Sequence, residues 1–135
     1  MYEDGILYNR DKTEIITAIN SVSSNDEDGL QLILPNSLTL IPTSAFYKCA
    51  ALTEVVLPEN LQIIGLRAFY NCSNLVKCNL PKQLKTLSNY AFYNCRKLKE
   101  LVLESEELPD LADNNYVTYY CGRDVTEGMK IVVGN

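Results

Sequence analysis

A repeat of 23 residues most constrains what this 135-residue chain can fold into. Three consecutive copies run through residues 31–103 and keep the same residue types at equivalent positions. In the second copy these positions are Leu57, Pro58, Leu61, Ile64, Ala68, Phe69, Tyr70, Cys72 and Leu75. Repeats of roughly 20–50 residues are typical of stacked proteins, because one copy cannot bury its own apolar side chains. We therefore expect a stack of coils in which Phe46, Phe69 and Phe92, the only phenylalanines of the chain, form one buried row.

Each copy is expected to contain a strand, a return path and a short helical stretch. The strands are predicted at residues 32–34, 55–57, 78–80 and 101–103, with alternate side chains in the core. Proline has no N–H for a continuing ladder, so the strands should stop at Pro35, Pro58 and Pro81. The Ala-Phe-Tyr-x-Cys stretch is expected to form a turn or two of helix on the opposite side, held only by stacking on its neighbours.

Both ends depart from the repeat and are expected to act as caps. Residues 5–8 and 13–16 predict two strands around a polar turn, which would lie over the first coil. The acidic stretch 23–29 predicts a solvated loop. The other end predicts a degenerate coil, an insertion and a last strand, at residues 108–111, 114–128 and 130–133.

The motif Leu-Pro-x-x-Leu-x-x-Ile-x-x-x-Ala-Phe-Tyr-x-Cys-x-x-Leu, read from Leu57 to Leu75, resembles the BspA-like leucine-rich repeats. Residues 4–13 resemble the opening hairpin of that family, which is named for a bacterial surface antigen. The resemblance implies an α/β fold: a right-handed solenoid with a parallel concave sheet, short helical turns on the convex side and an N-terminal hairpin cap. The third copy departs from the motif at Cys78 and Asn79, which leaves any shared ligand open.

We expect one domain over residues 1–135, because a chain of this length can bury a core without disulfides or a metal. It divides into an N-terminal cap (1–30), the repeats (31–103) and a C-terminal cap (104–135). The family resemblance also implies a location: its known members are mostly surface or secreted proteins of bacteria and some protozoa. Several of them are adhesins towards host matrix proteins or other cells.

Charge and composition argue against several classes of function. The net charge of −5 predicts no broad basic face, so nucleic acid and anionic membrane surfaces are poor partners. No apolar run is long enough to cross a bilayer, and the acidic start of the chain is unlike a secretion signal. The chain has no histidine, the commonest general base and zinc ligand. We therefore expect that the chain is not an enzyme and has no cofactor or metal site. A solvated loop is predicted for a cluster of four carboxylates, with a weak cation site as the alternative; these are Glu104, Glu106, Glu107 and Asp110.

The cysteines are expected to be free thiols in the core. Cys49, Cys72 and Cys95 occupy one repeat position, and no Cys-x-x-Cys pair occurs. Stacked equivalent residues point in parallel, which rarely suits disulfide geometry, although a disulfide is the alternative. Cys78 should face the core from its strand, and the state of Cys121 is left open.

Two surfaces are the main candidates for binding, and a third patch lies near the C-terminal cap. Side chains between the inward strand positions point outward and are mostly apolar, with polar and charged neighbours along their rim. They are Ile33, Val56, Asn79 and Val102, beside Gln31, Glu54, Lys77 and Glu100. The alternative is that these residues only suit sheet packing. Tyr47, Tyr70 and Tyr93 form the second candidate, with a structural ladder as its alternative, and Tyr116, Tyr119 and Tyr120 form a third patch.

The sequence therefore predicts a non-enzymatic module that holds a protein or glycan ligand through these surfaces. The alternative is a structural spacer or assembly segment of a larger surface protein. The oligomeric state is left open.

Overall fold

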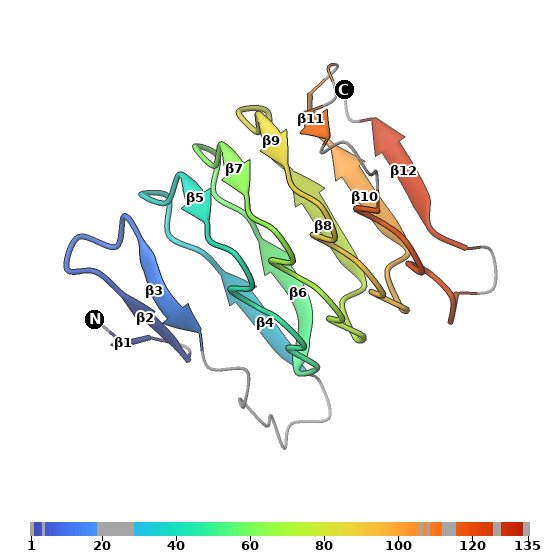
Figure 1. Cartoon of the computed structure of the whole chain (residues 1–135), viewed down its shortest axis with the longest axis horizontal. Helices are drawn as coiled ribbons and strands as arrows, with labels where there is room; N and C mark the ends of the chain where they lie inside the picture. Colours follow the sequence, from blue (N-terminus) through green and yellow to red (C-terminus); the bar gives the residue numbers. More distant parts are fainter. Residues whose placement is uncertain are drawn as a thin grey trace.

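Short strands and tight turns make up the computed structural model of this chain. The structure describes residues 2–3, 5–18, 29–105, 107, 109–111, 116–125 and 128–133. Within them the chain winds into stacked coils behind an N-terminal hairpin (Figure 1). The prediction of a solenoid with a parallel sheet and a hairpin cap is therefore confirmed.

A five-stranded parallel sheet, here the large sheet, runs along the stack. Its strand order is β12-β10-β8-β6-β4, which places the strands of successive coils side by side (Figure 1). The register pairs equivalent residues, for example Val102 with Asn79. In β4, β6, β8 and β10 the inward-facing side chains enter the core, as predicted. The strands are β4 (Leu30–Ile33), β6 (Leu52–Val56), β8 (Lys77–Leu80), β10 (Glu100–Leu103) and β12 (Lys130–Val133).

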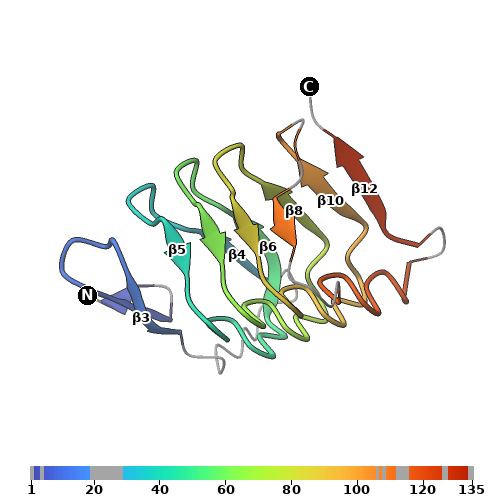
Figure 2. The same ribbon diagram turned by 45° about the horizontal axis from the view of Figure 1, so that its top comes forward.

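A second parallel sheet of two-residue strands forms the return path of each coil. Its order is β11-β9-β7-β5, and Figure 2 shows these short strands in front of the large sheet. The apolar residues predicted to turn inward, Ile41, Ile64 and Leu87, are its buried members. The pairing of β11 with β9 confirms a degenerate coil after the third copy, although Leu108 lies outside the described residues. The strands are β5 (Leu40–Ile41), β7 (Ile63–Ile64), β9 (Thr86–Leu87) and β11 (Asp110–Leu111).

An antiparallel sheet of β1 (Tyr2–Glu3), β2 (Ile6–Tyr8) and β3 (Ile15–Ala18) covers the first coil. The Asn9 side chain holds its turn, because its Oδ1 accepts hydrogen bonds from the N–H groups of Thr13 and Glu14 at 2.8 and 3.1 Å. Ile6, Tyr8 and Ile15 are buried in the same core as the coils. The predicted hairpin cap is thus confirmed, with β1 as an additional strand. Most of the acidic loop predicted at 23–29 lies outside the described residues.

The third side of the coil, here called the turn face, comprises residues 42–51, 65–74, 88–97 and 116–125. The helical stretch predicted there is wrong, since the described residues contain no helix. Every second N–H group of this stretch donates to a carbonyl of the next coil, as those of Ser44, Phe46 and Lys48 do. The N–H groups between them close four-residue turns, as where the N–H of Tyr47 donates to the carbonyl of Ser44. An α-helix needs every N–H for the carbonyl four residues earlier, so this pattern excludes it.

Left-handed backbone conformations make these turns possible. Ser44 and Lys48 have φ of 57°, and the equivalent residues Arg67, Asn71, Tyr90 and Asn94 have φ between 55° and 58°. Such values interrupt a right-handed helix and are easiest for glycine, asparagine and aspartate. Two of these six positions are asparagine, which is the local sequence feature that agrees with the turns.

The three phenylalanines form the predicted buried row. Phe46 and Phe69 have ring centroids 5.2 Å apart with an angle of 8° between their planes, and Phe69 and Phe92 have 5.2 Å and 6°. Phe69 and Phe92 have no exposed surface. The row runs along the core between the turn face and the two sheets, so each coil is held mainly by its neighbours.

The predicted insertion at residues 114–128 is wrong for the part that the structure describes. Residues 116–125 form the turn face of a fourth coil, because the N–H of Phe92 donates to the carbonyl of Val117 and that of Asn94 to Tyr119. The predicted last strand is confirmed as β12, paired in parallel with β10. Ile131 and Val133 of β12 occupy inward positions yet stay 57% and 58% exposed, so the described residues leave this end of the core uncovered.

Candidate functional site

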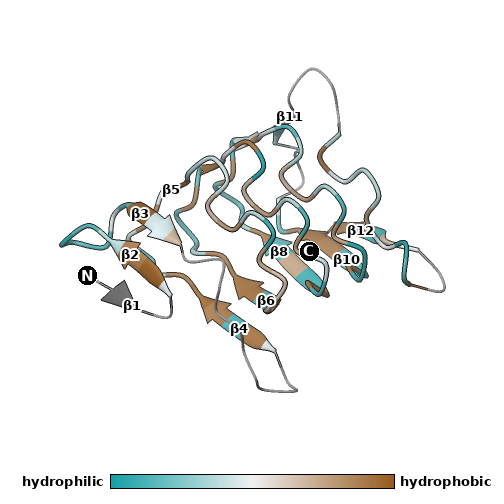
Figure 3. Ribbon diagram, turned by 60° about the horizontal axis from the view of Figure 1, so that its bottom comes forward, coloured by the Kyte–Doolittle hydropathy of each residue, from teal (hydrophilic) through white to brown (hydrophobic). Residues whose placement is uncertain are grey.

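The outer face of the large sheet carries a row of aliphatic side chains. Ile33 and Val56 are paired in register and are 73% and 47% exposed, while Val102 is half-buried and Asn79 is exposed. Figure 3 shows the apolar character of β4, β6 and β10 and the more polar β8 between them. Val132 on β12 continues the row beside Val102, which the sequence reasoning missed. The structure thus brings the predicted sheet residues together; that they bind a ligand stays a prediction.

Charges of alternating sign flank this row. The register places Gln31, Glu54, Lys77, Glu100 and Lys130 side by side across the sheet. Lys77 Nζ lies 3.4 Å from a carboxylate oxygen of Glu100, with both side chains about half exposed. Because water screens such an exposed pair, it contributes little stability. The charged row therefore offers a partner both signs of charge at fixed spacing.

A shallow hollow lies between the two rows. Its volume is about 200 Å³, and it opens over the sheet between β6 and β8. The aliphatic side chain of Val56 lines it, and Glu54, Lys77, Asn79 and Glu104 provide polar walls. A hollow with an apolar part and charged walls suits one inserted side chain of a partner.

Tyrosines form a ladder across the turn face. The rings of Tyr47 and Tyr70 stack at 4.9 Å, and those of Tyr70 and Tyr93 at 4.8 Å. Tyr119 of the fourth coil extends the ladder, with its ring 5.9 Å from Tyr93. The structure therefore shows the tyrosine column as a continuous stack, and Tyr119 of the predicted third patch extends it; that these tyrosines bind a ligand stays a prediction.

A second stack lies beside the first. Tyr90 and Tyr116 stack at 5.6 Å, and Tyr90 meets Tyr93 edge-on at 5.5 Å. The turn face thus contains seven of the nine tyrosines of the chain. Sequence reasoning missed Tyr90 and the continuity with the fourth coil. A spacing of 26 residues, from Tyr90 to Tyr116 and from Cys95 to Cys121, could have revealed the fourth coil. It differs from the 23-residue spacing of the other repeats and so escapes a search at that offset.

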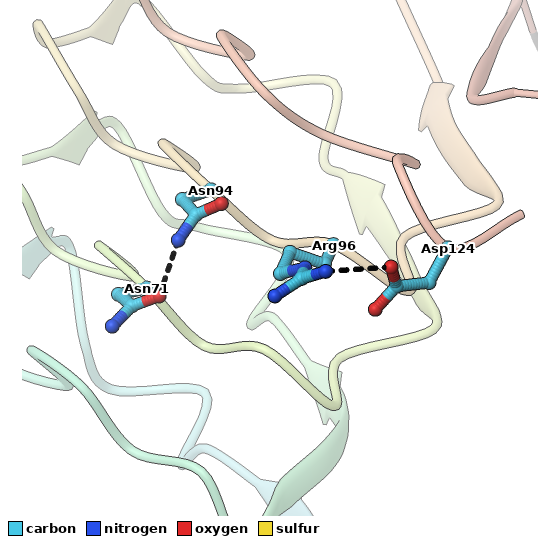
Figure 4. A network of polar contacts seen from close by, with 4 residues as sticks. All are labelled: Asn71, Asn94, Arg96 and Asp124. Atoms are coloured by element: carbon cyan, nitrogen blue, oxygen red, sulfur yellow. Dashed lines mark hydrogen bonds and ion pairs between the residues drawn. The ribbon is translucent and has the colours of Figure 1, made fainter.

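Polar side chains tie the coils together beside the ladder. Asn94 Nδ2 donates to Asn71 Oδ1 at 2.7 Å, and Arg96 pairs with Asp124 at 3.0 Å (Figure 4). Desolvation raises the pKa of Tyr93, and a hydrogen bond with Tyr120 raises that of Tyr119. Both phenols therefore keep their proton well above neutral pH and can donate as well as accept hydrogen bonds.

All five cysteines are free thiols, as expected for Cys49, Cys72 and Cys95; the sequence leaves the state of Cys121 open, and the structure shows it as a free thiol as well. Cys72 and Cys95 Sγ donate to the carbonyls of Phe46 and Phe69 at 3.1 and 3.2 Å. Cys121 continues the same column, donating to Phe92 O at 2.7 Å, and it is the one that is not fully buried. Cys78 faces the core, as predicted. The thiols therefore fill the core and satisfy turn carbonyls.

We expect one of the five thiols to react in the native protein. Burial raises the pKa of Cys49, Cys72 and Cys78, and the neighbouring Cys121 thiol raises that of Cys95. The Cys95 thiol lowers the pKa of Cys121, which is also the least buried of the five, so its reactive thiolate forms at lower pH than the others. Ellman's reagent at pH 8 should therefore label one thiol quickly and all five after unfolding in guanidinium.

The control for this labelling is Cys121→Ser, which should abolish the fast phase and leave four thiols that react only on unfolding. A fast phase that survives the substitution would contradict the assignment.

The described part of the chain contains no group of three or more cysteine, aspartate, glutamate or histidine residues placed to hold a metal ion. Glu106 of the predicted carboxylate loop lies outside that part. In the same described residues no helix is long and apolar enough to span a membrane.

Three solved structures show the fold in known proteins. The pneumococcal vaccine antigen PcpA matches 98% of this chain with 28% identity and a TM-score of 0.70. A leucine-rich repeat protein of T. pallidum matches 95% with 22% identity and a TM-score of 0.62, and one of Bacteroides capillosus matches 99% with 19% identity and a TM-score of 0.71. The last two, at these identities, show the fold alone.

This chain matches different fractions of the length of these three proteins. The chain spans 30% of PcpA, 60% of the T. pallidum protein and 98% of the B. capillosus protein. No curated protein sequence matches the chain.

A sequence profile described as a BspA type leucine rich repeat region matches residues 13–119 in six copies. It covers most of the chain, and it extends beyond residues 31–103 into the hairpin on one side and the fourth coil on the other. Repeats of this class are generally non-catalytic modules. The chain therefore belongs to the BspA-type leucine-rich repeat family.

Proposed function

We propose that the chain is a non-enzymatic module, on the cell surface or secreted, that binds a protein partner through the outer face of the large sheet. The observation that carries this proposal is the exposure of Ile33 and Val56 at 73% and 47% beside the hollow. By family resemblance, this sheet is the concave side of a right-handed solenoid. The similarity to the pneumococcal vaccine antigen PcpA supports this location.

The energetics favour a protein ligand for this face. Burying one exposed aliphatic side chain contributes about 1.5–3 kcal/mol, and Ile33 and Val56 lie in register on neighbouring strands. Glu54, Lys77 and Glu100 would add specificity and faster association more than affinity. An apolar centre with a charged rim is the usual anatomy of a protein interface.

The test replaces the two aliphatic side chains by threonine, as Ile33→Thr/Val56→Thr. Threonine keeps the β-branched shape, so the melting temperature should change by no more than about 3 °C. Binding to a responsive member of a panel of immobilised collagen, fibronectin and laminin should weaken at least about 10-fold. Biolayer interferometry measures the affinity and circular dichroism the stability.

The control variant Ile16→Thr/Ile63→Thr removes two exposed aliphatic side chains from other strands, β3 and β7. It should leave binding unchanged. An equal loss in both variants would remove the sheet face from consideration. Absence of binding to every panel member would favour the spacer alternative.

A further inference from the structure

The charges of the chain are segregated, although its net charge is −5. The turn face contains five basic residues and one acidic residue, a net charge of +4, so the rest of the chain is strongly acidic. The basic residues are Lys48, Arg67, Arg96, Lys97 and Arg123, and the acidic residue is Asp124. The net charge, which predicted no broad basic face, averages over the molecule and does not reveal this segregation.

Three of these cations lie against the tyrosine stacks. Lys48 Nζ is 5.3 Å from the ring centre of Tyr47, and the guanidinium carbon of Arg67 is 5.6 Å from that of Tyr90. Arg123 lies over Tyr120 at 4.9 Å. Cation–π contacts hold these side chains over the rings. Asp124 is paired with Arg96, so the acidic residue of the face does not neutralise these three.

The rings themselves offer polar groups. In the ladder of Tyr47, Tyr70, Tyr93 and Tyr119 each ring face covers the face of a neighbour, at 4.8 to 5.9 Å. A partner therefore meets ring edges and hydroxyl groups, and it meets one such group at every coil. The stacked ring faces of this ladder are therefore not available as the open aromatic faces that anchor a protein hot spot.

We propose that the turn face binds an acidic polysaccharide, a chain of sugars that carry carboxylate or sulfate groups. Lys48, Arg67 and Arg123 pair with the anionic groups, and the tyrosine hydroxyls exchange hydrogen bonds with sugar hydroxyls. A polymer of similar units suits a surface that repeats the same hydroxyl from coil to coil. An acidic peptide offers the charge but few hydroxyls. This site is separate from the large sheet, so its failure leaves the proposed protein-binding function untouched.

The test uses heparin and hyaluronan oligosaccharides as sulfated and carboxylated probes, with isothermal titration calorimetry on the whole chain. Binding to either probe, weaker at higher salt, is expected, because salt screens exposed charges. The variant K48Q/R67Q/R123Q should lose at least about 10-fold in affinity. The control R10Q/K82Q/K85Q makes the same change in net charge at exposed positions outside the turn face and should lose less than about 2-fold. Equal losses in the two variants would overturn the proposal.

The tyrosine hydroxyls are tested by Tyr70→Phe/Tyr93→Phe, which keeps the stacked rings. Affinity should fall about 3-fold or more with an unchanged melting temperature, since only hydroxyl contacts are removed. Poly-L-glutamate serves as the competing acidic polymer without sugar hydroxyls. If it binds as tightly as the oligosaccharides, or if neither oligosaccharide binds at low salt, the assignment to a polysaccharide is wrong.

Discussion

Phe69→Ala should lower the free energy of unfolding by about 3–5 kcal/mol. The ring has no exposed surface and lies between the rings of Phe46 and Phe92, each 5.2 Å away. Its removal leaves a cavity in the middle of the stack, where coils on both sides lose packing. Hydrogen bonds between the backbones of neighbouring coils hold the surrounding chain in place, so the cavity cannot collapse.

Urea unfolding followed by circular dichroism measures this loss. Phe69→Leu, which keeps most of the volume, should cost less than about 1.5 kcal/mol and provides a folded reference. The matched aromatic control is Tyr116→Ala, because this ring also stacks on a neighbour but is 41% exposed. It should cost about 0.5–1.5 kcal/mol. Equal costs for Phe69→Ala and Tyr116→Ala would show that the phenylalanine row is not the main support of the stack.

The repeat predicted the stack because equivalent residues must lie over one another. Leu32, Val55 and Cys78 enter the core from neighbouring strands, and the prolines end those strands, as expected from sequence alone. The family profile agrees with this register. Side-chain periodicity therefore predicted the large sheet and the inward residues of the return path, but not that the return path forms a second sheet.

Periodicity could not predict the conformation of the turn face. The buried positions Ala45, Phe46 and Cys49 are compatible with one helical turn, and short helical turns are the usual choice there. The turn conformation is set by hydrogen bonds to the next coil and by the positive φ of residues such as Lys48. Only tertiary contacts stabilise both features. Local propensity was overridden by stacking.

The candidate surfaces were predictable to different degrees. Alternation along the strands placed Ile33, Val56 and Asn79 on the outer face, and the structure agrees. The tyrosine ladder was only partly visible, because the fourth coil has Thr118 where the other coils have phenylalanine. The basic character of the turn face was hidden by acidic residues elsewhere. Position in the coil, more than composition, decides what a partner meets.

Gly65→Ala should destabilise the chain by about 1–2 kcal/mol, against the usual direction of this substitution. The φ of Gly65 is not positive, so alanine would ordinarily stabilise by about 0.4–1 kcal/mol through the unfolded state. A Cβ at this position, however, would lie 2.7 Å from the carbonyl oxygen of Ile41 and 2.8 Å from backbone atoms of Pro42 and Thr43. Such overpacking costs about 1–3 kcal/mol, which exceeds the gain.

The preceding coil cannot easily move away from that Cβ. The N–H of Gly65 donates to the carbonyl of Ile41 at 2.8 Å, and Ile41 pairs with Ile64 in the second sheet. Ser88 occupies the same repeat position one coil later, so Ser88→Ala is the matched control and should change stability by less than about 0.5 kcal/mol. Thermal and urea unfolding of both variants measure the difference. If Gly65→Ala proves as stable as the parent, the first two coils are not in the close backbone contact that makes glycine necessary there.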